Sequence, residues 1–260
     1  MTAAAAVPAF PHQLMRRQEA SDLMEACSAL LEVRLQQRLE QAQPRPLGLA
    51  TGRTMEPLYA ALVQRLQAWP ATKLEALRAG WLSFNLDEYI GLPGADQASY
   101  RNYMDVQLGQ PLGLSPAQVR LPDGSADNPG VAAAAYGAEL AGSGGAGFQL
   151  LGLGSNGHVG FNEPPCDADA RCRVVDLSPA TRQQNAGFFG GDPERVPVQA
   201  ITLGVKEILQ AEEIHLVVTG VAKAAVLQRL LNEPPSVDLP ASWLQRHPQV
   251  WIWADGAALS

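Results

Sequence analysis

Short apolar segments recur along this chain, most of them followed by a turn rich in glycine or polar residues and then by a helical pattern. This recurrence constrains the fold more than any other feature. The segments span residues 47–50, 81–86, 148–153, 214–218 and 250–253. Apolar strands that alternate with helices are typical of a parallel sheet that helices cover on both faces. We therefore expect an α/β fold with a three-layer, open, mostly parallel, Rossmann-like sheet.

The chain is long enough for one large α/β domain or two small ones, with 260 residues of which 47% are hydrophobic. No composition break or long linker divides it, so we predict a single domain over residues 1–260, in which residues 1–12 form a loose N-terminal arm. Apolar residues at helical spacing predict a helix over about residues 19–43, and Pro44 and Pro46 end it.

Charge and cysteine content exclude several classes of protein. The net charge is −7 and no basic run occurs, which argues against a nucleic-acid partner. No apolar run reaches the ~20 residues of a membrane span, and the Ala-rich start is not preceded by the charged region of a signal peptide. The three cysteines form no C-x-x-C pair, which favours free thiols over disulfides or a zinc site. We expect a cytoplasmic enzyme with no membrane partner.

Polar residues and glycines stand where the apolar segments end. These positions are Thr51, Asp87, Asn156 and Gly220. The carboxyl ends of parallel strands meet at one edge of a sheet, and ligands of open α/β sheets bind outside that edge. The pattern therefore predicts that these four positions border a single ligand site.

Two features at this edge could hold an anion. The turn after the first segment reads Thr51-Gly52-Arg53-Thr54. Its free N–H groups could cradle a phosphate, which glycine allows to approach closely; the alternative is an ordinary turn in which a threonine caps the next helix. Lys223, predicted one turn into a helix, fits either an anion site or a solvated surface position.

Candidate proton-transfer groups follow the second and third segments. Asp87 and Glu88 are adjacent, and neighbouring side chains of an extended segment point opposite ways. One carboxylate could therefore face a cleft as a general base while the other anchors the loop, although a solvated acidic turn is the alternative. Four glycines hold His158 between Asn156 and Glu163. An imidazole moves protons near neutral pH, although a lone histidine is more often structural.

Taken together, six segments resemble the motifs of the glucosamine-6-phosphate deaminase family, which is related to the 6-phosphogluconolactonases. They read LGLATGRT, FNLDEYIGLP, SYRNYM, GLGSNGHVGFNEP, TRQQNAGFF and GVAKA, and their order and approximate spacing agree with the family from about Leu47 to the end. The GLGSNGHVGFNEP segment is the most specific, because the lactonases share its Gly-His pair without the Phe-Asn-Glu-Pro that follows.

The resemblance implies conversion of glucosamine 6-phosphate into fructose 6-phosphate and ammonia, without a metal or an organic cofactor. Asp87 would move a proton between C2 and C1 of the open-chain sugar, and His158 would carry the proton needed for ring opening. Glu163, with Asn156, would orient and tune the histidine, and Glu88 would support the Asp87 loop.

The resemblance also implies which residues bind this small sugar phosphate. Gly152 and Gly160 would line the sugar site. The 6-phosphate would be held by the turn and by one lysine, namely by Thr51, Gly52, Arg53, Thr54 and Lys223.

The chain departs from the family pattern at several positions. Arg53 is extra in the turn, and Met55 replaces a common proline. Gly187 stands where many members carry an arginine for the phosphate, and we hypothesise that Arg53 substitutes for that arginine from the opposite side of the site. Cys166 and Asp167 replace the serine pair of the activator site in allosteric members, and the chain ends soon after its last predicted strand. A short, non-allosteric monomer or small homo-oligomer is expected.

Three other functions compete with this interpretation. A lactonase-like hydrolase or a galactosamine-6-phosphate isomerase would use the same fold, and a sugar-phosphate sensor would keep the fold without turnover. The joint presence of Asp87, His158 and Glu163 argues against the sensor. The changes at Arg53 and Gly187 leave the identity of the sugar open.

Overall fold

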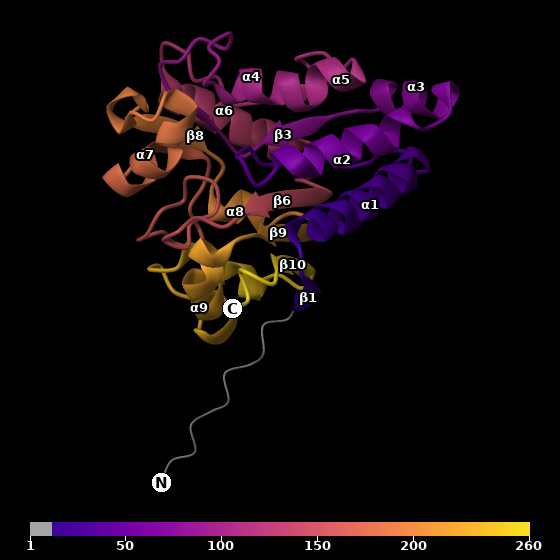
Figure 1. The fold of residues 1–260 in the computed structure, drawn as a ribbon. Helices are drawn as coiled ribbons and strands as arrows, with labels where there is room; N and C mark the ends of the chain where they lie inside the picture. The colour runs from indigo at the N-terminus through magenta and orange to yellow at the C-terminus, as the bar shows by residue number, and fades with distance from the viewer. Residues whose placement is uncertain (1–11) are drawn as a thin grey trace.

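A computed structural model describes residues 12–260 as a seven-stranded sheet flanked by helices (Figure 1). Its strands all run parallel, in the order β1-β10-β9-β6-β2-β3-β5. A second sheet has three antiparallel strands in the order β4-β8-β7. The predicted α/β class with an open, mostly parallel sheet is confirmed.

The strands have these bounds: β1 His12–Arg17, β2 Leu47–Leu49, β3 Ser83–Asn85, β4 Asp87–Tyr89, β5 Val119–Arg120, β6 Phe148–Gly152, β7 Arg173–Asp176, β8 Gln199–Thr202, β9 Glu213–Val218 and β10 Val250–Asp255. The α-helices are α1 Ala20–Leu39, α2 Glu56–Gln67, α3 Ala71–Ala79, α4 Tyr100–Met104, α5 Gln110–Leu112, α6 Pro129–Gly142, α7 Pro179–Asn185, α8 Val205–Ile208 and α9 Ala224–Asn232. A π-helical turn, η1, spans Asp105–Gly109, and the 3₁₀ turns are η2 Ala186–Phe189, η3 Pro193–Arg195, η4 Val221–Lys223 and η5 Pro240–Arg246.

The five apolar segments predicted as strands all form strands of the large sheet, namely β2, β3, β6, β9 and β10. One boundary needs correction, because the segment 81–86 does not lead into Asp87 within one strand. The chain leaves the large sheet at Leu86, whose N–H donates to the carbonyl of Leu49 and whose carbonyl accepts the N–H of Leu203. Asp87 then begins β4 of the small sheet. The site carboxylate therefore stands where the two sheets meet.

Other elements had no clear pattern in the sequence. Strands β1, β5, β7 and β8 are short, half-exposed or polar, so they lack the long apolar run of a strand that is buried on both faces. Residues 1–11 of the expected N-terminal arm lie outside the described residues, whereas His12 begins β1. The segment 123–147, rich in Gly and Ala, contains α6, which starts with an Asn128 cap and Pro129.

Helices lie on both sides of the large sheet (Figure 1). Helices α1 and α2 pack together on one side, and α1 also contacts β10. On the other side α6 contacts α8, and its Tyr136 ring lies 5.4 Å from the ring of Phe84 on β3. The expected helix over 19–43 stops at Leu39, before the two prolines. Within the described residues, no helix is both long and apolar enough to span a membrane.

The edge strand β1 and the central sheet are joined by pairs far apart in the chain. Residues of β1 pair in register with β10, from His12 opposite Val250 to Arg17 opposite Asp255. The side chains add to this pairing, because the indole N–H of Trp251 donates to Oε1 of Gln13 at 3.1 Å. The first described strand is thus held by the last.

Candidate active site

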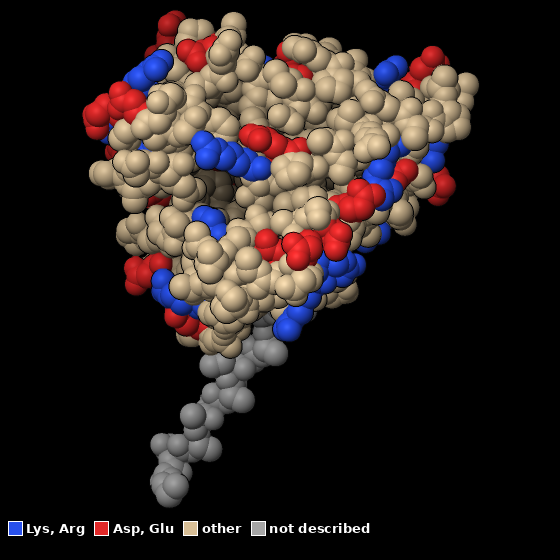
Figure 2. Space-filling model, viewed as in Figure 1, with Lys and Arg blue, Asp and Glu red and all other residues tan. Residues whose placement is uncertain are grey.

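A cavity of about 310 Å³ lies at the carboxyl ends of the central strands, where the sequence predicts a ligand site. Its walls come from the ends of β2 and β6, from β4, and from the segments around α7 and η4. The molecular face in Figure 2 is hollowed near its centre, with Lys and Arg side chains on the border of the hollow. The predicted residues that line the cavity are Thr51, Gly52, Arg53, Thr54, Asp87, Gly152, His158, Gly160 and Lys223. Three other predicted residues, Asn156, Glu88 and Glu163, do not line the cavity.

The carboxylate of Asp87 faces the cavity from the start of β4, opposite Thr202 of β8. Its side chain is 5% exposed. Burial, together with the neighbouring charge of Glu88, raises the pKa of Asp87 well above its usual range. A carboxyl group whose pKa is raised in this way is a stronger proton acceptor when ionised, which suits a general base that operates near neutral pH.

The adjacent carboxylate of Glu88 points away and holds the backbone. It accepts hydrogen bonds from the N–H groups of Tyr89 at 2.9 Å, Tyr100 at 3.0 Å and Arg101 at 2.7 Å. Burial raises the pKa of Glu88, and these donors oppose the rise. The opposite orientation of the two carboxylates follows from their alternation along β4, and Glu88 thereby ties the Asp87 strand to the start of α4.

The imidazole of His158 lies directly over Gly154. A Cβ at position 154 would come within 2.3 Å of the ring, so only glycine leaves room for it. Asn156 holds the ring in place, because its Oδ1 lies 2.6 Å from Nδ1 of His158 and also accepts the backbone N–H of His158 at 3.3 Å. An amide oxygen can only accept, so Nδ1 carries the proton and Nε2 is left as the acceptor.

Burial makes the imidazole of His158 neutral at physiological pH. It lowers the pKa of His158 to about 4, with the charge of Glu163 opposing the shift and that of Lys223 adding to it. Glu163 acts on the ring through its charge, and its Oε1 accepts the backbone N–H of Ser178 at 3.2 Å. A neutral imidazole with a free Nε2 is equipped to take a proton from a ligand hydroxyl.

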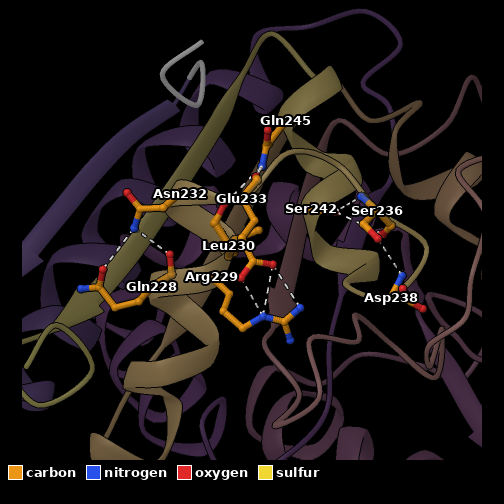
Figure 3. Close-up of polar contacts among 9 residues, drawn as sticks. All are labelled: Gln228, Arg229, Leu230, Asn232, Glu233, Ser236, Asp238, Ser242 and Gln245. Atoms are coloured by element: carbon orange, nitrogen blue, oxygen red, sulfur yellow. Dashed lines mark hydrogen bonds and ion pairs between the residues drawn. The ribbon is translucent and has the colours of Figure 1, made fainter. Parts of the chain in front are cut away.

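The loop that carries His158 is supported by the segment after α9. The N–H of Ala241 donates to the carbonyl of Gly157 at 2.8 Å, and a Cβ at Gly157 would lie 2.2 Å from Leu239. Within that segment Ser242 Oγ accepts the N–H of Ser236 at 2.8 Å (Figure 3). The loop of His158 therefore packs against a segment more than 70 residues away in the chain. The indole N–H of Trp243, in the same segment, also donates to the carbonyl of Cys166.

The turn of residues 51–54 precedes α2 without capping it. Helix α2 begins at Glu56 with Met55 at the N-cap position and no side-chain cap, so neither threonine has the alternative role of a cap. The hydroxyl of Tyr103 donates to the carbonyl of Gly52 at 2.9 Å and holds the turn against α4. The turn is thus available to line the cavity.

Lys223 lies in η4, the 3₁₀ turn just before α9, and not within the helix as the sequence predicts. Gly220 begins this turn, and its N–H donates to both carboxylate oxygens of Asp255 at 3.1 Å. Partial burial in the cavity wall lowers the pKa of Lys223. Among residues 12–260, Arg53 and Lys223 are the two cationic side chains that line the cavity.

Several lining residues were not singled out in the sequence, namely Tyr100, Phe161, Gln184, Asn185 and Phe188. Their segments SYRNYM, GLGSNGHVGFNEP and TRQQNAGFF carry the family motifs, which was the available signal. The side chains of Tyr100 and Asn185 meet at the Tyr89 hydroxyl, at 3.1 and 3.0 Å. As for metals, the described part of the chain holds no group of three or more His, Cys, Asp or Glu side chains suited to a metal ion.

A buried carboxylate and a neutral imidazole on one cavity, with two cations on its wall, define the site of an acid–base enzyme for an anionic ligand. The comparisons with known proteins agree. Residues 18–253 match the family model described as "Glucosamine-6-phosphate isomerases/6-phosphogluconolactonase", and the chain belongs to this family.

Relatives within the family are named more specifically. The glucosamine-6-phosphate deaminase of Rhodopirellula baltica is 43% identical over 225 residues, which cover 85% of this chain and 87% of the relative. The glucosamine-6-phosphate deaminase 2 of Bacillus subtilis is 39% identical over 237 residues, covering 90% and 91%.

Solved structures extend the comparison to three dimensions. A monomeric glucosamine-6-phosphate deaminase superimposes with a TM-score of 0.86 at 34% identity, covering 95% of this chain and 100% of that one. The 6-phosphogluconolactonase of Trypanosoma brucei superimposes with a TM-score of 0.74 at 21% identity, covering 96% and 98%. The second similarity shows a shared fold and no more.

Proposed function

We propose that the protein is a glucosamine-6-phosphate deaminase, which converts glucosamine 6-phosphate and water into fructose 6-phosphate and ammonia. The observation that carries the proposal is the joint position of Asp87 and His158 on one cavity, in a chain of this family. The relatives named above, at about 40% identity over most of their length, carry this name.

The two groups divide the proton transfers between them. His158 accepts the proton of the anomeric hydroxyl at Nε2 and returns it to the ring oxygen, which opens the pyranose to an aldehyde. Asp87 then takes the proton from C2 and delivers it to C1, so that an enolamine forms and becomes a C2 imine. Water adds to the imine carbon, and ammonia leaves. Each general acid–base step of this kind contributes roughly 10²–10⁴-fold to the rate.

Positioning residues keep these groups in place in the proposed reaction. Glu88 fixes the direction of Asp87 through three backbone N–H donors, and Asn156 fixes the tautomer of His158. Glu163 keeps a negative charge near the imidazole and favours its protonated form when it accepts a proton. Gly152 and Gly160 form the wall beside the sugar.

The 6-phosphate binds at the opposite end of the proposed site, between the turn of residues 51–54 and Lys223. The turn that precedes α2 and Lys223 line the same cavity, and free N–H groups of such a turn can bind a phosphate. Holding the open chain by its phosphate places C1 and C2 beside Asp87, and orientation of this kind lowers the barrier further.

An assay with two substrates tests the proposal. Purified protein should release ammonia from glucosamine 6-phosphate and should leave 6-phosphogluconolactone at its spontaneous rate of hydrolysis. Galactosamine 6-phosphate is the control for the sugar epimer. Lactone hydrolysis without ammonia release would replace the proposal with the lactonase function, and activity on neither substrate would favour a sensor.

We propose further that the protein is a single-domain monomer in the cytoplasm. A similar solved structure is that of a monomeric deaminase, and the core forms one large hydrophobic cluster with a small one beside it. Its cysteines are free in the described residues, which is typical of a reducing compartment. Light scattering at assay concentration measures the oligomeric state, and a mass of twice 27.7 kDa would contradict the monomer.

A further inference from the structure

The guanidinium of Arg53 occupies the space where a side chain at position 187 would begin. A Cβ built on Gly187 would lie 1.6 Å from Nη2 of Arg53 and 2.7 Å from its Cζ. These two residues come from segments far apart in the chain, the turn before α2 and the 3₁₀ turn η2, whose Phe188 also lines the cavity. The bare backbone at Gly187 is therefore what allows Arg53 to rest across the cavity mouth.

An aromatic contact holds the guanidinium there without neutralising it. Its Cζ lies 5.5 Å from the ring centroid of Phe188, which also lines the cavity. Among the ion pairs of residues 12–260 none involves Arg53 or Lys223. Two uncompensated cations on one small cavity form a site for a ligand with more than one negative charge.

We propose that Arg53 and Gly187 act as one recognition unit for the phosphate dianion of the substrate. Arg53 supplies the second cation opposite Lys223, and Gly187 lacks a side chain because the guanidinium takes its place. The inference rests on the proposed function and names the residues that decide its preference for phosphorylated sugars. A guanidinium presents two parallel N–H donors to a pair of phosphate oxygens, which an ammonium cannot do.

The unit also joins the ligand to the segment of α7 and η2. The guanidinium that faces the cavity rests on Gly187 and near Phe188 of that segment. Asn185, in the same segment, donates at 3.0 Å to the hydroxyl of Tyr89, the last residue of the Asp87 strand β4. A ligand bound by Arg53 is therefore linked through Gly187 and Phe188 to the segment that also contacts the Asp87 strand.

A double-mutant cycle tests the unit. Arg53→Ala should raise KM for glucosamine 6-phosphate, and the Kd of inorganic phosphate measured by calorimetry, by about 10–100-fold, which is the scale of a charged hydrogen bond. Gly187→Ala adds one methyl group that displaces the guanidinium, so it should raise both values in the same direction by a smaller factor. The double variant should match Arg53→Ala within about twofold, because the methyl group then has nothing to displace.

Arg229→Ala is the matched control. Arg229 lies on α9, the helix that follows Lys223, and its guanidinium is already paired with Glu233 at 3.0 Å (Figure 3). Its loss removes the same charge from the protein without touching the cavity, so KM and phosphate binding should stay as in the wild type. Thermal unfolding of each variant confirms that it is folded before binding is compared.

Each outcome decides between the claims. Unchanged KM and unchanged phosphate binding in Arg53→Ala would overturn the unit, and so would losses in the two single variants that multiply in the double variant. Failure of the wild type to release ammonia would overturn the proposed function instead. The phosphate titration still tests the role of Arg53 and Gly187 in that case, because phosphate binding does not depend on turnover.

Discussion

Two buried histidines, His158 and His215, stand in contrasting regions of the same sheet. His158 is 7% exposed at the carboxyl end of β6 and borders the cavity. His215, on β9, is 0% exposed and stacks between Phe148 at 4.1 Å and Trp251 at 4.8 Å. Burial lowers the pKa of both imidazoles.

The difference lies in what each ring nitrogen can reach. Nδ1 of His215 accepts the indole N–H of Trp253 at 3.0 Å, and its Nε2 lies 3.7 Å from Glu213, whose other oxygen binds Arg34. Both ring nitrogens of His215 thus face protein groups. Nε2 of His158, in contrast, has no hydrogen-bond partner among the described residues. A lowered pKa alone does not identify a functional histidine; access to a cavity does.

The largest effect is expected in the cavity region, at Asp87. Asp87→Asn should lower the rate of ammonia release by about 10³–10⁴-fold, because the amide cannot take the C2 proton. The folded-state pKa of Asp87 is raised, so its ionised form costs stability as pH rises above the usual range of a carboxyl group. Unfolding at pH 7 should therefore show a variant at least as stable as the wild type. Wild-type exchange of solvent hydrogen at C2 in this variant would exclude Asp87 as the base.

His158→Gln should lower turnover of the closed-ring substrate by about 10²-fold, because the glutamine amide cannot accept and return the ring-opening proton. An open-chain analogue bypasses that step and should be slowed less. The ratio of the two rates, measured for wild type and variant, is the readout. Equal slowing of both compounds would exclude a role of His158 in ring opening.

His215→Ala should do the reverse and affect stability while leaving chemistry intact. It removes the ring stacks on Phe148 and Trp251 and the contacts with Trp253, a loss of about 2–4 kcal/mol in the free energy of unfolding. Denaturant unfolding measures the loss, and kcat per folded protein should stay at the wild-type value. A fall in kcat without a fall in stability would mean that the stack serves the site.

Acid should weaken the wild type more than His158→Gln. The pKa of His158 falls from 6.5 to about 4 on folding, so the neutral ring contributes stability that is present above pH 6.5 and lost as pH falls toward 4. Glu163 and Lys223, the charged groups that act on His158, are unchanged in the variant, so the comparison isolates the loss of the imidazole. Urea unfolding at pH 7, 6 and 5 should show the advantage of the wild type shrinking. A difference in the free energy of unfolding that does not change with pH would mean that the ring of His158 is solvated and that folding does not lower its pKa.

The smallest expected effect is that of N-acetylglucosamine 6-phosphate, which should leave the rate curve hyperbolic and unchanged. Cys166 is 5% exposed, with Sγ 3.6 Å from Arg173, and the adjacent Asp167 carboxylate repels a phosphate. Initial rates over a range of substrate, with and without this compound, provide the test. A sigmoidal rate curve that becomes hyperbolic when the compound is added would show that the protein has an activator site.

Much of the fold could be predicted because β2, β6, β9 and β10 are apolar runs that only a doubly covered sheet can bury. The small sheet could not, because β4, β7 and β8 are only three or four residues long and β7 is half-buried, so they form no clear apolar pattern. The split of the second predicted strand at Leu86 was also hidden, since the residues on both sides of it are buried alike.

Much of the candidate site could be predicted from where the strands end. The opposite directions of Asp87 and Glu88 follow from the alternation of an extended chain. The role of Gly154 could not be foreseen in detail: the space it leaves is filled by the ring of His158 and not by a substrate. The contact of Arg53 with Gly187 joins segments more than 130 residues apart, and only the folded chain brings them together.

The pairing of β1 with β10 has a consequence for how the protein is made. Gln13 and Trp251 are 238 positions apart, and a ribosome adds roughly 5–20 residues per second. Strand β1 therefore waits about 10–50 seconds for its neighbour to be translated, and the turn that presents Lys223 waits for Asp255. Asp87 and His158 are translated well before the strand that completes the sheet. The enzyme therefore becomes active after β10 has been translated, and not in steps as the chain lengthens.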